Sequence, residues 1–316
     1  MNGAPQPIVE FHGVDRHLFD TEIMPRAEPA VLRGLVDAWP AVRRARESDK
    51  ALCDWLQTLD SGADVDALML PPAEHGRIFY GPRFEHGERG FNYLHNRLPI
   101  SRVIEQLQRY ALFDSAPAVM VQSALASVCT PAFNAGHRMP LLDADVQPRL
   151  WLGNAAVTPT HFDESSNIAC VAAGERVFTL FPPEQIANLY VGPMSHAPTG
   201  TPISLVDLAA PDLQRFPRFA TAWAQALRAT LAAGDALYIP PLWWHHVASR
   251  RPLNLLVNYW WRAQAAPSGL QALEQARAAF ARFPPAQRRA WQALFAHWIF
   301  EADGQTNAHI PPPLRD

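Results

Sequence analysis

The pattern of hydrophobic and polar positions changes character twice along this 316-residue chain, near residues 149 and 262. In the first part, apolar residues three and four positions apart predict helices over residues 41–59 and 99–112, with a shorter helix near 17–24. Short apolar runs predict strands over 29–40, 65–70, 77–80 and 118–122. The first part is therefore predicted to be a mixed α/β region.

Between residues 149 and 262 the pattern is one of short strands separated by turn residues. The predicted strands are 149–154, 160–163, 168–172, 176–181, 236–239, 245–248 and 253–261. A proline-rich excursion at 182–218, longer than a passive connection usually is, precedes a predicted helix over 219–231. Many short strands with polar turns are typical of a jelly-roll or cupin barrel. The predicted fold is mainly β with flanking α: a double-stranded β-helix with an N-terminal α/β elaboration and C-terminal helices.

After residue 262 two helical segments are predicted, over 269–283 and 285–300. The second carries an apolar stripe of Trp291, Leu294, Phe295 and Trp298. Such a stripe either covers the barrel or pairs with its twin in a homodimer. We therefore expect three parts: an elaboration at 1–117, a barrel at 118–262 and a helical, dimerising segment at 263–316.

Composition narrows the class of protein. A formal charge of −3 offers no basic field for nucleic acid or an anionic membrane. The three cysteines have no CxxC spacing, which argues against a disulfide framework or a zinc ribbon. The N-terminal residues do not resemble a signal peptide, and no apolar run approaches the roughly 20 residues that span a bilayer. We expect a cytoplasmic protein without membrane or nucleic-acid partners.

The candidate chemistry is concentrated around residue 161. His161 and Asp163 are separated by one residue, so a strand would project both to one face and Phe162 to the other. A second imidazole could come from His245 or His246, of which only one can face into the barrel. Two histidines and one carboxylate form the facial triad that suits Fe(II). The alternative is a surface pair and an unrelated core histidine.

Arg176 is a candidate anion-binding residue, because it shares a strand face with Phe178 and Leu180. If that face points inward, the buried guanidinium needs an anion, which a bound dicarboxylate would supply. If it points outward, Arg176 is a solvated residue beside Glu175.

Three further polar residues flank these positions. Thr158 and Asn167 lie on either side of the His161–Asp163 pair, although Thr158 is an odd offset from His161 and would face the wrong way unless Pro159 breaks the alternation. Asn258 shares a face with apolar residues, so it is either a hydrogen-bonded core asparagine or a contact of a metal-bound acid.

Several segments of the sequence resemble the Jumonji C, cupin-like hydroxylases, in particular the asparaginyl hydroxylase of hypoxia-inducible factor and its bacterial relatives. The matching segments are Pro29-Ala-Val-Leu-Arg-Gly-Leu-Val-Asp-Ala-Trp-Pro40, Val157-Thr-Pro-Thr-His-Phe-Asp-Glu-Ser-Ser-Asn167, Phe181-Pro-Pro-Glu-Gln185, Gly234-Asp-Ala-Leu-Tyr-Ile-Pro-Pro-Leu-Trp-Trp-His-His246 and Val257-Asn-Tyr-Trp260. The resemblance covers residues 29–262.

The resemblance implies a dioxygenase that uses Fe(II), 2-oxoglutarate and O2. It implies that the iron ligands are His161, Asp163 and His245. It also implies 2-oxoglutarate contacts from Thr158, Asn167, Asn258 and Trp260, with Gln122 retained. Arg176 stands where the family has the lysine that anchors the distal carboxylate, and Met120 aligns with a tyrosine that the hypoxia hydroxylase uses for the same group.

The implied reaction is hydroxylation of a protein or peptide side chain with release of succinate and CO2. A small-molecule hydroxylase and a non-catalytic, metal-binding cupin-like module are the alternatives. Because the hypoxia hydroxylase dimerises through C-terminal helices, the resemblance also favours a homodimer.

Overall fold

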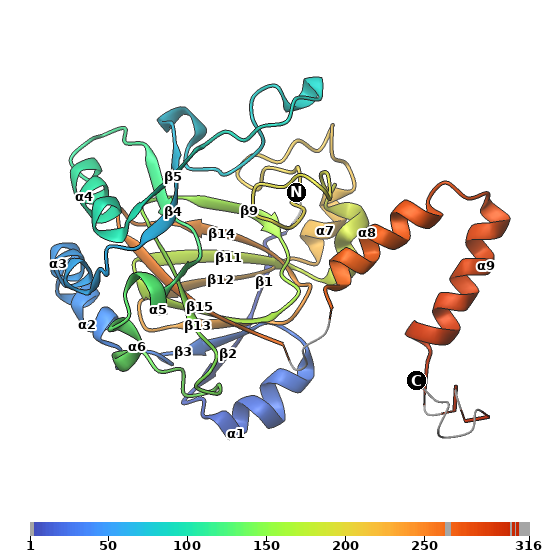
Figure 1. The fold of residues 1–316 in the computed structure, drawn as a ribbon, viewed down its shortest axis with the longest axis horizontal. Coiled ribbons are helices and arrows are strands. Elements are labelled where there is room, and N and C mark those ends of the chain that lie inside the picture. Colours follow the sequence, from blue (N-terminus) through green and yellow to red (C-terminus); the bar gives the residue numbers. More distant parts are fainter. Residues whose placement is uncertain (1–2, 263–266, 304, 307, 310–316) are drawn as a thin grey trace. The chain divides into compact units, whose positions relative to one another are not determined.

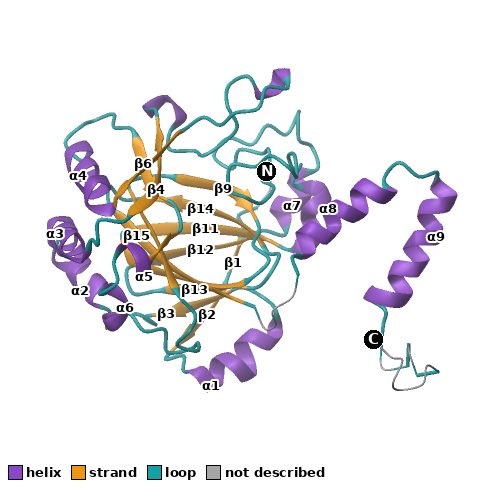
Figure 2. Ribbon diagram, in the orientation of Figure 1, coloured by secondary structure: helices purple, strands orange, loops and turns teal. Residues whose placement is uncertain are grey.

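Two β-sheets that face each other form the centre of the chain, as Figures 1 and 2 show for the computed structural model. The structure describes residues 3–262, 267–303, 305–306 and 308–309. Residues 1–263 form one compact unit and residues 264–316 a second. The predicted boundary between 262 and 263 adjoins residues 263–266, which lie outside the described residues.

The smaller sheet has five strands in the order β1-β12-β11-β14-β9. Their bounds are Gln6–Pro7, Leu227–Ala232, Glu175–Phe181, Trp244–Ser249 and Val157–His161. The pairs β12–β11, β11–β14 and β14–β9 are antiparallel.

The larger sheet has ten strands, ordered β2-β3-β13-β10-β15-β8-β6-β4-β5 with β7 beside β8. Their bounds, in that order, are Val9–His12, Ala30–Arg33, Ala236–Ile239, Ser166–Ala173, Asn254–Trp261, Pro148–Gly153, Ala118–Val121, Asp64–Leu70, Leu94–Pro99 and Ala124–Leu125. Gly174 makes the turn from β10 to β11 with a φ of 79°, a conformation that favours glycine.

Alternation along the strands separates the hydrophobic core into an inner and an outer layer. Between the sheets, Ala169 and Val171 of β10 pack with Phe178 and Leu180 of β11. Residues of opposite parity, such as Ile168 and Cys170, face away from this interior and pack under the helices. The inner layer thus forms the barrel of a double-stranded β-helix, the fold class predicted from the sequence.

Helices cover the outer face of the larger sheet. Leu52 and Leu56 of α3 and Val103 and Ile104 of α4 share one core cluster with outward residues of the sheet such as Val257. The helices of the first unit are α1 (Arg16–Leu18), α2 (Pro40–Glu47), α3 (Asp49–Leu59), α4 (Ile100–Tyr110), α5 (Ala126–Cys129), α6 (Phe133–Gly136) and α7 (Phe219–Ala224). These helices cover the outer face of the larger sheet, so its inner face, toward the barrel interior, is the one that they leave free.

Two of the predicted N-terminal elements need correction. The helix expected over 41–59 is two helices, because Ser48 has an extended backbone and caps α3 by accepting a hydrogen bond from the backbone N–H of Ala51 (3.0 Å). The strand expected over 77–80 is absent from the described residues; only isolated bridges form at Arg77 and Tyr80.

The helix predicted over 219–231 is wrong in its second half. Helix α7 ends at Ala224, and β12 begins at Leu227. Leu227 and Leu231 pack in the barrel core, whereas Arg228 between them is exposed. This period of two, rather than the alanine-rich composition, decides the structure because β12 pairs with β11 along its whole length.

The second unit consists of α8 (Gly269–Phe280) and α9 (Pro285–Phe295), the latter continued by one π-helical segment, Ala296–Phe300. Phe280 packs on Trp291, with ring centroids 4.5 Å apart, and on Phe295. No residue of these helices is buried. Among the described residues, no helix combines the length and apolarity needed to cross a bilayer.

Candidate metal centre

The end of β9 places the first two candidate ligands. β9 ends at His161, so Asp163 follows the strand rather than lying in it, in contrast to the strand predicted over 160–163. Phe162 still points away, because its ring packs on Trp244 with centroids 4.9 Å apart. The Asp163 carbonyl accepts a hydrogen bond from the backbone N–H of Leu242 (2.8 Å), which ties this turn to the segment that enters β14.

Strand β14 supplies the third side chain and settles which histidine faces inward. His245 is paired in register with His161, and the two ring centroids are 4.2 Å apart. His246 lies on the opposite face of the sheet, where it lines a different cavity with Val177 and Thr179. Trp244, of the same parity as His246, is buried in a separate hydrophobic cluster.

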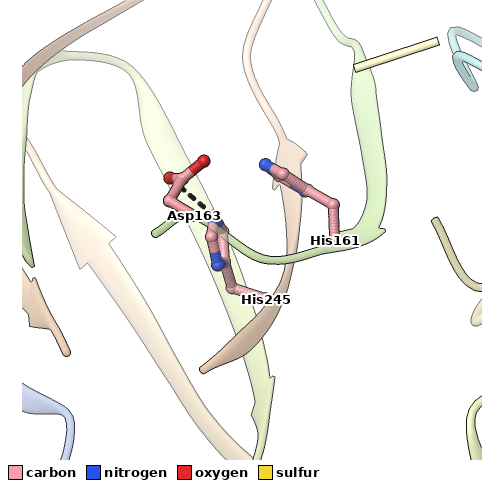
Figure 3. A group of neighbouring side chains, drawn as sticks. All are labelled: His161, Asp163 and His245. Atoms are coloured by element: carbon pink, nitrogen blue, oxygen red, sulfur yellow. Dashed lines mark ion pairs between the residues drawn. The ribbon is translucent and has the colours of Figure 1, made fainter. Parts of the chain in front are cut away.

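His161, Asp163 and His245 converge on one point, as Figure 3 shows. One potential ligand atom from each lies within 4.8 Å of the others. The Nε2 atom of His245 is 3.6 Å from Oδ2 of Asp163. That carboxylate oxygen is buried and has no hydrogen-bond partner among the described residues. A buried carboxylate oxygen without a donor fits a site that is completed by a cation.

Backbone carbonyls fix the orientation of both imidazoles. Nδ1 of His161 is 2.9 Å from the carbonyl of Pro159, and Nδ1 of His245 is 3.0 Å from the carbonyl of Trp243. A carbonyl can only accept, so each Nδ1 carries the proton and each Nε2 keeps its lone pair. Burial, followed by the nearby His245, lowers the pKa of His161, which favours the neutral form that binds metal. The donor set therefore fits a facial-triad metal such as Fe(II).

A cavity of about 350 Å³ extends from the three side chains into the barrel. Every candidate site residue of the sequence analysis lines it: His161, Asp163, His245, Thr158, Asn167, Arg176, Asn258, Trp260 and Gln122, together with Met120. The structure thus brings all of these residues together, while their roles in binding stay predictions.

Arg176 lies inside the barrel and is 3% exposed. Burial lowers its pKa to about 9, so the guanidinium is still cationic at neutral pH. Its Nη2 donates to the carbonyl of Trp151 (3.3 Å), but its Nε has no partner. Within the described part of the chain no carboxylate lies within 4 Å of it. An unpaired buried cation is costly, so this position favours an anionic ligand.

Asparagine and tryptophan groups provide further unpaired polar atoms at the cavity. Asn258 donates through Nδ2 to Oδ1 of Asn167 (2.6 Å), which leaves Oδ1 of Asn258 buried without a partner. The indole N–H groups of Trp260 and Trp151 are also buried and unpaired among the described residues. A ligand with oxygen acceptors would satisfy the two indoles.

A register shift explains how Thr158 reaches the cavity. His245 pairs with His161, but Val247 pairs with Thr158, so β9 has one more residue than β14 between these pairs. Such a bulge reverses the alternation across Pro159 and Thr160, and Thr158 lines the cavity with His161 despite the odd offset.

Trp151 and Arg149, which line the cavity from β8, were not among the site residues predicted from the sequence. They alternate with Leu150 and Leu152, which are fully buried on the helix-covered side. The period of two was visible in the predicted strand 149–154, but nothing in it indicated which face was inward.

Comparison with known proteins agrees with this geometry. The model of a family described as the cupin-like domain matches residues 16–266. The chain belongs to this cupin-like family. The barrel formed by the two sheets agrees with this assignment.

Curated relatives of the chain are JmjC proteins. It is 27% identical over 241 residues to JmjC domain-containing protein D of Dictyostelium discoideum, covering 73% of the chain and 51% of that protein. It is 27% identical over 280 residues to the human bifunctional peptidase and (3S)-lysyl hydroxylase JMJD7, covering 78% and 80%. A 114-residue stretch is 37% identical to the Arabidopsis thaliana lysine-specific demethylase JMJ31, covering 36% of the chain and 20% of that protein.

The chain therefore spans about half of the first relative and a fifth of the third. Of these relatives, one is named as a hydroxylase and another as a demethylase.

Proposed function

We propose that this protein is an Fe(II)- and 2-oxoglutarate-dependent dioxygenase that hydroxylates a protein or peptide side chain. The observation that carries the proposal is one cavity with a His–Asp–His triad and, deeper in the same barrel, a buried arginine without a carboxylate partner. A keto diacid has groups for both ends, because its oxo acid can chelate a metal and its distal carboxylate can pair with a guanidinium.

We assign tasks to the cavity residues that the sequence predicted. His161, Asp163 and His245 hold Fe(II), with Nε2 of each imidazole as donor. Arg176 holds the distal carboxylate, aided by Thr158, and the Asn167–Asn258 pair orients the metal-proximal end next to Trp260. Gln122 and Met120 border the remaining space.

When bound, iron, 2-oxoglutarate and O2 supply the oxidising chemistry, with succinate and CO2 as coproducts. The protein's own contribution is to position these groups and exclude water. Phe178, Ile239 and Leu256 contribute apolar surface to the cavity. That lining keeps the electrostatic interactions inside the barrel strong.

The choice of a protein or peptide substrate rests on the relatives, one of which is named as a lysyl hydroxylase and another as a lysine-specific demethylase. Hydroxylation is the outcome that we propose for this chain. A small-molecule substrate within the same chemistry is the alternative that the assay below distinguishes. The expected cytoplasmic location stays a prediction.

The test is conversion of 2-oxoglutarate to succinate by the full chain with Fe(II) and ascorbate, with and without a peptide library. We expect slow uncoupled turnover that a peptide accelerates and that His161→Ala abolishes. Acceleration by metabolites but not by peptides would assign a small-molecule substrate. Absence of turnover, together with a fold that chelators leave unchanged, would contradict the proposal in favour of a binding module.

We also propose that the chain forms a homodimer through its C-terminal helices. Trp291, Leu294, Trp298, Ile299 and Phe300 are each at least 37% exposed. Two short helices without a buried side chain lack the core needed for stability by themselves. A second copy offers the same apolar stripe and would cover it by two-fold symmetry.

A further inference from the structure

Arg149 is a second arginine at the candidate site, with no role in the metal or keto-acid assignments. It extends from β8 into the same cavity as the triad and is half-buried. Its neighbour across the strand pair is Asn258, so it lies level with the Asn167–Asn258 pair. Arg176 lies deeper, at the level of Trp151, whose carbonyl it contacts.

The guanidinium of Arg149 is held from one side only. Nη1 donates to the carbonyl of Ser123 (3.1 Å) and approaches its Oγ (3.5 Å). Its central carbon, Cζ, lies 5.9 Å from the ring centroid of Trp260, within the range of a cation–π contact. Nε and Nη2 make no hydrogen bond to the described residues, which leaves two donors for a ligand.

Ser123 adopts a backbone conformation that is uncommon for a residue with a side chain. Its φ is 53°, in the left-handed region, between β6 and β7. Such conformations persist where the surroundings hold them, often at ligand sites. Here the conformation presents the carbonyl that orients Arg149.

Charge balance indicates what Arg149 binds. A keto diacid and Asp163 would together bring three negative charges to the cavity, which a divalent metal and Arg176 would neutralise. Asp66 is the other carboxylate that lines the cavity among the described residues, and its side chain is half-exposed. Its Oδ1 atom already pairs with Nε2 of His95 (3.0 Å) and Nε of Arg97 (3.7 Å). Among the described residues, no carboxylate lies within 4 Å of Arg149. Among the described residues, the positive charge of Arg149 is therefore left without a paired anion at the cavity.

We infer that Arg149 is a substrate-binding residue that pairs with a carboxylate of the substrate, so that the protein selects peptides with an aspartate or glutamate at or next to the modified residue. This inference rests on the proposed function, whose substrate class it narrows. The fork of free donors on Arg149 matches a carboxylate in bidentate geometry.

The experiment is selection of peptides from a displayed random library on the full chain loaded with Mn(II) and N-oxalylglycine, an inert 2-oxoglutarate analogue. We expect one position to be enriched in Asp or Glu. For the best peptide, replacing that acid by its amide should weaken binding to the wild type by about tenfold or more. The same replacement should have little effect on Arg149→Gln, as a double-mutant cycle requires.

Controls separate this role from a general charge effect. Arg102→Gln removes an exposed arginine of α4 that pairs with Glu105, so it should bind like the wild type. Arg149→Lys keeps the positive charge but loses the planar guanidinium, so it should retain part of the preference for acidic peptides. This variant replaces Arg149→Gln in the experiment if Arg149→Gln does not fold. The competing assignment is that Arg149 binds 2-oxoglutarate itself. Calorimetric titration of Arg149→Gln with 2-oxoglutarate tests it.

Several results would overturn the inference: no enriched acidic position, an acid-to-amide loss that is equal in wild type and Arg149→Gln, or loss of 2-oxoglutarate binding in Arg149→Gln. N-acetylaspartate amide is a small acid that could compete with the peptide for the protein. If it binds as tightly as the peptide does, the ligand of Arg149 is a small acid and not a peptide. Acidic preference that depends on Arg149 without succinate production would uphold the inference while the proposed function fails.

Discussion

At the scale of single residues, the buried guanidinium of Arg176 has no carboxylate partner among the described residues, and this unfavourable burial indicates an anion-binding site. A guanidinium that is 3% exposed, with one hydrogen bond to the carbonyl of Trp151, destabilises the ligand-free fold. A ligand that supplies the missing anion would recover that free energy on binding. In the proposed function, the burial that lowers the pKa of Arg176 would also strengthen its pairing with a carboxylate.

The substitution Arg176→Met should therefore separate stability from binding. We expect the ligand-free variant to be more stable than the wild type, by about 1–4 kcal/mol, because an unpaired buried charge is removed. We also expect the rise in melting temperature on adding 2-oxoglutarate with Mn(II) to disappear. Thermal denaturation with and without ligand measures both, and Arg176→Lys is the control that should keep part of the ligand effect. A less stable variant that still responds to 2-oxoglutarate would contradict this role.

At the scale of elements, the β9–β14 pair builds the centre. Registration of His245 on His161 brings the two imidazoles together, and the bulge across Pro159 and Thr160 adds Thr158 to the same face. The turn after β9 carries Asp163 back toward His245. Because successive side chains of a strand point to opposite faces, His245 faces the cavity whereas His246 faces the other side of the sheet.

Substituting each of the two histidines tests this parity. His245→Ala should lower the affinity for Mn(II) by more than about 100-fold, because loss of a direct ligand exceeds the 10–100-fold effect of groups that only orient ligands. His246→Ala should change it by less than about threefold. Calorimetric titration with Mn(II) measures both, with circular dichroism to verify folding. Equal losses in the two variants would mean that the metal does not sit between β9 and β14.

At the scale of the whole molecule, the two units differ in how they are stabilised. The first has buried clusters on both faces of its larger sheet. The second has an aromatic contact between Phe280 and Trp291 but leaves Trp298, Ile299 and Phe300 exposed. An apolar surface of this kind marks a contact with another surface.

The proposed dimer predicts the effect of charge on that surface. Trp298→Glu combined with Ile299→Glu should convert a dimer to a monomer, because each charge would have to be buried in the symmetric contact. Light scattering at micromolar concentration measures the mass. Leu112→Glu, at an exposed position between α4 and β6, is the matched control and should leave the mass unchanged. A wild-type chain that is already monomeric would end the proposal.

The fold class and the three candidate metal ligands could be predicted from the sequence alone, whereas the ligands' role in metal binding stays a prediction. Short strands separated by turn residues from residue 149 onward predicted the barrel, because strand and turn preferences are local properties of the chain. The motif residues His161, Asp163 and His245 were identifiable by resemblance, and so was Arg176 in place of a lysine. The prediction of a helix over 219–231 was wrong in its second half, because pairing with β11 makes Leu227–Ala232 a strand.

The face of each strand that points inward, and the polar groups that have no hydrogen-bond partner, became known from the three-dimensional structure. The choice of His245 over His246, the bulge that turns Thr158 inward and the approach of Arg149 to Ser123 all depend on pairing between segments far apart in the chain. The unpaired state of Arg176 is likewise a property of its surroundings. The physical reason is that register and burial are set by contacts between strands, which no local pattern specifies.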